Sequence, residues 1–148
     1  MPQINWTRLI IGGFVAAIIM FFADGFFHEK VVHADWLALY AALGSTPPER
    51  HGINVLYFAV FELGRGMISI LLYVTMRAFF GAGPKTAVLA GIAGWIAFSL
   101  TGPVQFIPLG FFSNALWLKV GAFHLVTSII ATLAGAAIYK DAKAVARA

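Results

Sequence analysis

Four long apolar segments, separated by short polar stretches, dominate the pattern of this sequence. We place them at residues 6–28, 52–77, 86–107 and 115–139. Each has at least the ~20 residues that a helix needs to cross the hydrocarbon core of a bilayer. The pattern therefore predicts an all-α fold, a bundle of four transmembrane helices. No linker or shift in composition divides the chain, so we expect a single domain over residues 1–148.

The longest polar interruption runs from Glu29 to His51, between the first two apolar segments. Within it, large side chains recur at the i, i+3, i+4, i+7 spacing of an amphipathic helix, at Trp36, Leu39, Tyr40 and Leu43. Trp and Tyr favour the headgroup level of a membrane. We therefore expect a short amphipathic helix on the membrane surface between the first and second spans.

Small residues indicate how the spans pack. They gather in the first segment at Gly12, Gly13, Ala16 and Ala17, and in the third at Ala87, Ala90, Gly91, Gly94 and Ala97. Such residues let two helix backbones approach closely, so both segments should present a contact face. Near the end of the third segment, Thr101-Gly102-Pro103 predicts a kink or a stop, because proline has no N–H to donate. The conformation of residues 103–114 stays open at this point.

The composition agrees with a membrane protein. Of the 148 residues, 61% are hydrophobic and 11% are charged, whereas a soluble domain carries about 25% charged residues. The mean hydropathy is +0.88. The chain has no cysteine, which excludes disulfides, thiolate metal sites and cysteine nucleophiles.

Lys and Arg lie mostly at the ends of the apolar segments, although the net charge is only +4. This placement is typical of residues that set membrane orientation and argues against nucleic acid as a partner. The side that holds both termini carries Arg8, Arg77, Lys85, Lys140, Lys143 and Arg147, and the other side carries Lys30, Arg50 and Lys119. The positive-inside rule then predicts cytoplasmic termini. We expect the membrane to be a bacterial inner membrane.

Polar and ionisable residues interrupt the apolar segments and form the candidate site. They are Asp24, His28, Glu62, Arg65, Gln105 and His124. At 1.5 Å per residue, Glu62 and His124 lie about 15–16 Å below the outer surface, and Asp24 about 6 Å below it. All four spans therefore bring polar groups toward the same half of the bilayer. Ionisable groups at such depth usually face other helices or water.

Several interpretations of this cluster remain open. Glu62 and Arg65, at i and i+3, are spaced to form an ion pair that locks the bundle. The same residues also suit an outward-facing polar pocket for a ligand, an ion or a proton. Asp24, His28, Glu62 and His124 are metal-ligand types, but no Glu-x-x-His pair occurs as in carboxylate-bridged bundles. His124 alone is an alternative ligand for a haem or a chlorophyll, so metal and cofactor stay unknown.

The sequence also resembles a family of small bacterial four-helix membrane proteins. The resemblance lies in residues 5–13 (NWTRLIIGG), in 35–36 (DW) and 41–44 (AALG), and in 81–87 (GAGPKTA). It implies the four-helix architecture over most of the chain and implies no activity or substrate.

Two functions follow as expectations. The first is a non-enzymatic accessory subunit or partner-binding module, embedded in the lipid bilayer beside other membrane protein subunits or further copies of itself. The alternative is a protein that binds or transports a small molecule or an ion through the polar pocket. No serine lies in a nucleophile motif, so we identify no catalytic residue.

Overall fold

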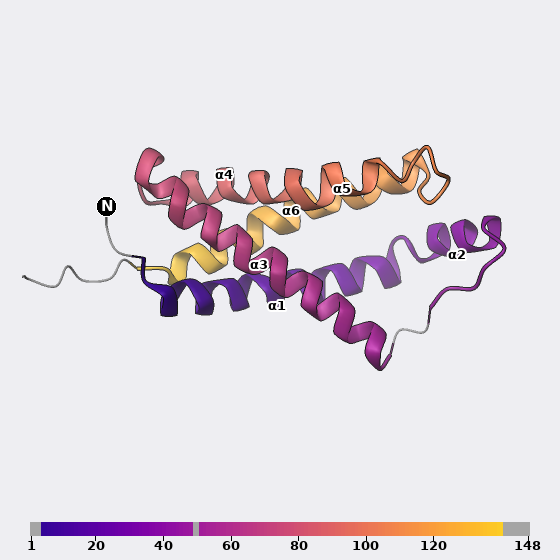
Figure 1. Cartoon of the computed structure of the whole chain (residues 1–148), viewed down its shortest axis with the longest axis horizontal. Helices are drawn as coiled ribbons and strands as arrows, with labels where there is room; N and C mark the ends of the chain where they lie inside the picture. The colour runs from indigo at the N-terminus through magenta and orange to yellow at the C-terminus, as the bar shows by residue number, and fades with distance from the viewer. Residues whose placement is uncertain (1–3, 49–50, 141–148) are drawn as a thin grey trace, which may run out of the picture.

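The computed structural model describes residues 4–48 and 51–140, and these residues form helices joined by turns, with no strand among them (Figure 1). The long helices are α1 (Trp6–Lys30), α3 (Ile53–Phe80), α4 (Pro84–Trp95) with its continuation, and α6 (Asn114–Ile138). Four segments are long and apolar enough to cross a membrane, and their limits lie within three residues of the predicted spans. The all-α four-span fold is therefore confirmed.

The third span changes its helical form before it ends. After α4 the chain forms a π-helical turn, Ile96–Leu100, and then the short helix α5, Thr101–Val104. Pro103 removes a backbone donor at this point, and the Thr101 hydroxyl donates to the Ile96 carbonyl oxygen at 2.9 Å. Residues 105–112 form successive turns. The predicted interruption at Thr101-Gly102-Pro103 thus lies in the short helix α5, between the π-helical turn and the end of the span.

The four spans form a bundle in which α1 and α4 each pack against both α3 and α6. In Figure 1 the α3–α4 turn and the two ends of the described chain lie at one end of the bundle. The helix α2 and the turn between α5 and α6 lie at the other end, which we call the α2 end. The polar residues of α1, α3 and α6 can therefore meet near the α2 end, as their sequence positions predict.

Glycines set the closest contacts between the spans. A Cβ atom added to Gly12 of α1 would lie 2.6 Å from the Gly135 carbonyl oxygen of α6. One added to Gly66 of α3 would lie 2.5 Å from the Gly13 carbonyl oxygen and 2.6 Å from the backbone nitrogen of Ala17. The expected contact face of the first span is therefore present, because these backbones meet without intervening side chains.

The helix α2 (His33–Ala42) is attached to the bundle through one face. Its Trp36 and Leu39 pack against an apolar cluster formed by Phe27, Val32, Leu116 and Val120. Its Asp35 also pairs with Lys119 of α6, whose Nζ lies 2.9 Å from the carboxylate. The predicted amphipathic helix is present, and its apolar face contacts α6.

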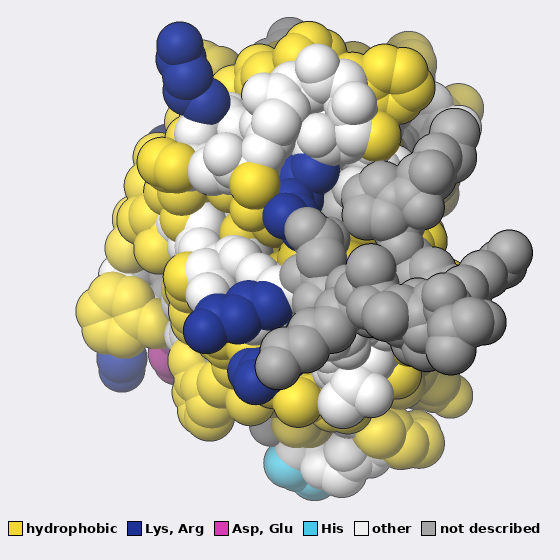
Figure 2. Space-filling view, turned by 90° about the vertical axis from the view of Figure 1, so that its left-hand side faces the viewer, with side chains coloured by type: hydrophobic (Ala, Val, Ile, Leu, Met, Phe, Trp, Pro, Cys, Tyr) yellow, Lys and Arg dark blue, Asp and Glu magenta, His cyan; other side chains and the backbone are white. Residues whose placement is uncertain are grey.

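Basic side chains gather at the end with the termini, which Figure 2 views directly. Of the predicted set, Arg8, Arg77, Lys85 and Lys140 are described there, and Lys30 and Lys119 belong to the α2 end. Arg77 lies over the rings of Tyr73 and Tyr139, at 5.5 and 4.9 Å from their centroids. The predicted roles of Arg50, Lys143 and Arg147 fall outside the described residues.

Candidate functional site: a buried charge cluster beneath an aromatic pocket

Arg65 lies at the centre of a charge cluster where α1, α3 and α6 meet. Its side chain is 2% exposed. Nη1 donates to the Asp24 carboxylate at 2.7 Å and to both carboxylate oxygens of Glu62 at 2.9 Å. Nη2 donates to the Ser128 hydroxyl at 3.3 Å. One guanidinium thus connects three spans.

The local sequence explains how these groups meet. Glu62 and Arg65 are three residues apart and therefore lie on the same face of α3. Gly66 presses the backbone of α3 against Gly13 and Ala17 of α1. Asp24 follows Ala17 by two helical turns, so it lies on the same side of α1, within reach of the long Arg65 side chain. The ion pair between α1 and α3 therefore depends on the small residues that let the two helices approach.

His124 extends the cluster on the α6 side. Its Nε2 lies 3.0 Å from Asp24 Oδ2, an ion pair whenever the imidazole is protonated. Nε2 itself makes no hydrogen bond to any described residue. Asp24 Oδ1 is also buried and accepts no hydrogen bond from the described part of the chain. The cluster therefore holds polar atoms whose hydrogen-bonding capacity is not used.

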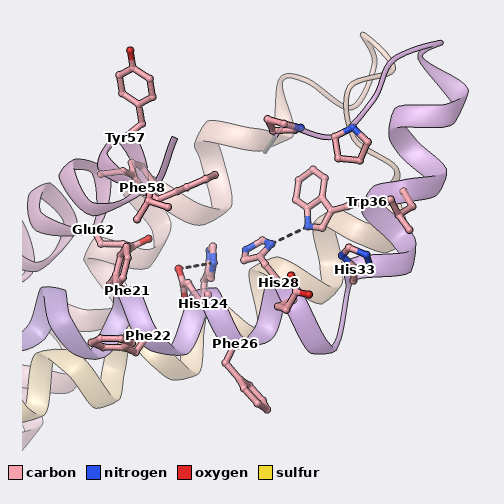
Figure 3. Close-up of a pocket in the computed structure, with 18 of the residues that line it drawn as sticks. Phe21, Phe22, Phe26, His28, His33, Trp36, Tyr57, Phe58, Glu62 and His124 are labelled. Carbon is pink, nitrogen blue, oxygen red and sulfur yellow. Dashed lines mark hydrogen bonds and ion pairs between the residues drawn. The ribbon is translucent and has the colours of Figure 1, made fainter. Parts of the chain in front are cut away.

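A hydrogen bond beside the cluster joins α1 to α2. The indole N–H of Trp36 donates to His28 Nδ1 at 2.8 Å. The rings of His28 and His124 have centroids 5.9 Å apart. Figure 3 shows Glu62, His124, His28 and Trp36 following one another along one side of a pocket. A polar row thus runs from the buried cluster toward the α2 end.

The pocket above this row has a volume of about 840 Å³ and lies between α1, α2 and the first half of α3. Its walls are mainly aromatic, with Phe21, Phe22, Phe26, Trp36, Tyr40, Tyr57, Phe58 and Phe61 among the lining residues. Asp24, Glu62 and His124 supply its polar floor. Arg65 does not line the pocket and lies behind the two carboxylates.

Five of the six predicted site residues come together. Asp24, His28, Glu62 and His124 line the pocket, and Arg65 joins the two acids from behind. Gln105 lies elsewhere: it is exposed, and its amide donates to the Gly102 carbonyl oxygen at 3.1 Å in the turn after the third span.

The structure adds two polar residues that we did not select from the sequence. Ser128 follows His124 by one helical turn, a spacing that marks it as a neighbour on the same face of α6. Trp36 belongs to the amphipathic stripe of α2, but nothing in that stripe indicates that its indole reaches His28.

The cluster is more suited to charge pairing than to metal binding. Within residues 4–48 and 51–140, no group of three or more His, Asp or Glu side chains is arranged to hold a metal ion. Two carboxylates face one guanidinium, so the cluster would carry one unbalanced negative charge with both acids ionised and His124 neutral. A cation or a proton at the pocket floor would balance that charge.

Comparison with known proteins does not identify a relative: no family model, no curated protein and no solved structure matches this chain.

Proposed function

We propose that this protein binds a small amphipathic molecule in the aromatic pocket, with the polar end of the molecule at the floor formed by Asp24, Glu62 and His124. The observation that carries the proposal is the combination of an 840 Å³ aromatic pocket with buried ionisable groups at its base. Small-molecule sites are usually concave and apolar, about 300–1,000 Å³ in volume, with a few placed polar groups.

The rim of the pocket supports entry from the lipid. Phe22, Phe26, Tyr57 and Phe58 are each more than half exposed in the isolated chain. In a bilayer these side chains would face lipid, because they belong to α1 and α3, which are long enough to span it. A ligand dissolved in the membrane would thus meet an apolar entrance before it met the charges.

A pocket-filling substitution tests the proposal. Gly25 lines the pocket, and a Cβ added there would meet no atom within 4 Å. Gly25→Leu should therefore narrow the pocket beside Asp24 without a clash at Cβ. Gly64→Leu is the matched control, since Gly64 also has open space but does not line the pocket.

Native mass spectrometry of protein extracted from its own membranes provides the measurement. We expect a small molecule to accompany the wild type and Gly64→Leu and to be absent from Gly25→Leu. A ligand retained equally by all three variants would show that it binds outside the pocket. Wild-type protein that carries no small molecule would contradict the proposal.

The proposed location is a bacterial inner membrane with both termini in the cytoplasm. The positive-inside rule supports this orientation, because four described bases lie at the end with the termini and two at the α2 end. The pocket would then open in the outer half of the bilayer.

Partner binding is a second candidate function, for an accessory subunit or a homo-oligomer. The supporting observation is the open position at Gly64 on α3, because small residues on the outer face of a span allow another helix to approach. Mild extraction separates the two functions. A stable assembly with another protein that Gly64→Leu disrupts would favour partner binding.

A further inference from the structure

We infer that the ligand carries a protonated amine at one end of an apolar body, and that this amine binds to Asp24 and Glu62. The inference rests on the proposed function and names the chemical class of its ligand. It follows from which charged groups face the pocket and which are hidden from it.

The pocket floor presents acceptors and hides the permanent cation. Asp24 and Glu62 both line the pocket, whereas Arg65 is 2% exposed and approaches the two carboxylates from behind. A ligand therefore meets carboxylate oxygens before it could meet the guanidinium. An anionic head would face two like charges, which is unfavourable in a poorly hydrated site.

Asp24 provides a specific acceptor. Asp24 is 7% exposed, and its Oδ1 accepts no hydrogen bond from the described residues, although Oδ2 contacts both Arg65 and His124. A buried acceptor without a partner is unfavourable, because it has lost its hydrogen bonds to water and gained none from the protein. An N–H of a protonated amine would satisfy Oδ1 with a charge-assisted hydrogen bond, which is stronger than a neutral one.

The charge balance also favours a cation. When both are ionised, Asp24 and Glu62 carry two negative charges against the single positive charge of Arg65. A protonated amine would neutralise the remainder while His124 is neutral. The aromatic walls suit both parts of such a ligand, since rings pack against an apolar body and attract a cation near their faces.

Radioligand binding in nanodiscs tests the inference. The probe is tritiated dodecylamine, with the protein in nanodiscs of zwitterionic phosphatidylcholine and with empty nanodiscs subtracted for partitioning. We expect saturable binding that unlabelled dodecylamine displaces and dodecanoate does not. Asp24→Asn and Glu62→Gln should each weaken binding at least tenfold.

Asp35→Asn is the control, because Asp35 pairs with Lys119 and does not line the pocket, so its affinity should match the wild type. Circular dichroism checks that each variant is folded. If Asp24→Asn fails to fold, Glu62→Gln still decides the outcome.

Two results would overturn the inference, and they are distinguishable. If dodecanoate competes as well as dodecylamine and both acid variants bind normally, the head group does not meet the acids. The pocket would then bind an apolar chain such as a lipid tail, and the proposed function would stand. If neither compound binds saturably to wild-type protein, the proposed function fails together with the inference.

Discussion

Arg65 donates to both buried carboxylates, so its removal leaves two acids facing each other in a poorly hydrated place with no cation to balance them. Arg65→Met keeps much of the volume and apolar stem of the side chain but removes the charge. Breaking a buried ion pair by deleting one partner usually destabilises a protein by about 3–5 kcal/mol. We expect the free energy of unfolding of Arg65→Met to fall by at least that amount, because both Asp24 and Glu62 lose their cation.

The acid variants should behave differently. In Asp24→Asn or Glu62→Gln, Arg65 still pairs with the remaining carboxylate, and the new amide oxygen still accepts a hydrogen bond. A hydrogen bond to a charged group contributes about 1.5–3 kcal/mol, and a charge-assisted bond is roughly twice as strong as a neutral one. The free energy of unfolding of each acid variant should therefore fall by only about 1 kcal/mol. The triple variant, which combines Arg65→Met with Asp24→Asn and Glu62→Gln, should be nearly as stable as the wild type. Buried ionic groups can often be replaced together without loss of stability.

Reversible unfolding in mixed micelles, with increasing sodium dodecyl sulfate, measures these differences through circular dichroism. All variants should be measured at the same pH, because a protonated His124 would supply a replacement charge beside Asp24. Arg8→Met is the matched control at an exposed position, where the change should stay within about 0.5 kcal/mol.

The order of the variants by free energy of unfolding decides whether the reasoning is correct. Equal stability of Arg65→Met and Asp24→Asn would refute it, because water or a bound ion would then be stabilising the carboxylates. A triple variant as unstable as Arg65→Met would show that the guanidinium acts through packing and not through charge.

Three further predictions concern helix contact, the link to α2 and orientation. Gly66→Ala should destabilise the bundle by about 1–3 kcal/mol, because its Cβ would overlap backbone atoms of α1, whereas Gly64→Ala should be neutral or stabilising in the same unfolding assay. His28→Phe removes the nitrogen that accepts the Trp36 indole N–H, so the tryptophan emission maximum should shift from that of the wild type, and this shift should be absent when Trp36→Phe is also present. A reporter active only in the cytoplasm should work when fused after Ala148 and fail when inserted at Ser45, and activity at Ser45 would reverse the proposed orientation.

The spans could be predicted because crossing a bilayer demands a length and an apolar composition that the sequence shows directly. The helix α2 could be predicted because its large apolar residues recur at a spacing that places them on one face of a helix. The segment from 103 to 114 could not be predicted, because proline permits either a kink or a stop. In the structure the span stops at Val104, and this leaves Gln105 in an exposed turn, away from the pocket.

The identity of the site residues could be predicted more readily than their contacts. Glu62 and Arg65 lie on one helix, so their spacing determines that they are neighbours. The contact of Asp24 with Arg65 depends instead on how α1 and α3 cross, which no local pattern specifies. We also estimated Asp24 as shallower, about 6 Å from the surface, because the first span was expected to end near His28. The helix α1 continues to Lys30, so Asp24 lies about 9 Å from its end at 1.5 Å per residue.

The crossing of α1 and α3 accounts for both parts of the site. The two backbones are in close contact where Gly66 meets Gly13 and Ala17, and the helices separate from there toward the α2 end (Figure 1). Near the crossing the gap is narrow enough for Arg65 to reach Asp24 across it. Beyond the crossing the wider space forms the pocket, which aromatic side chains of both helices line. The charges therefore lie at the base of the pocket because both features arise from the same contact, and a ligand that enters between α1 and α3 must stop at the carboxylates.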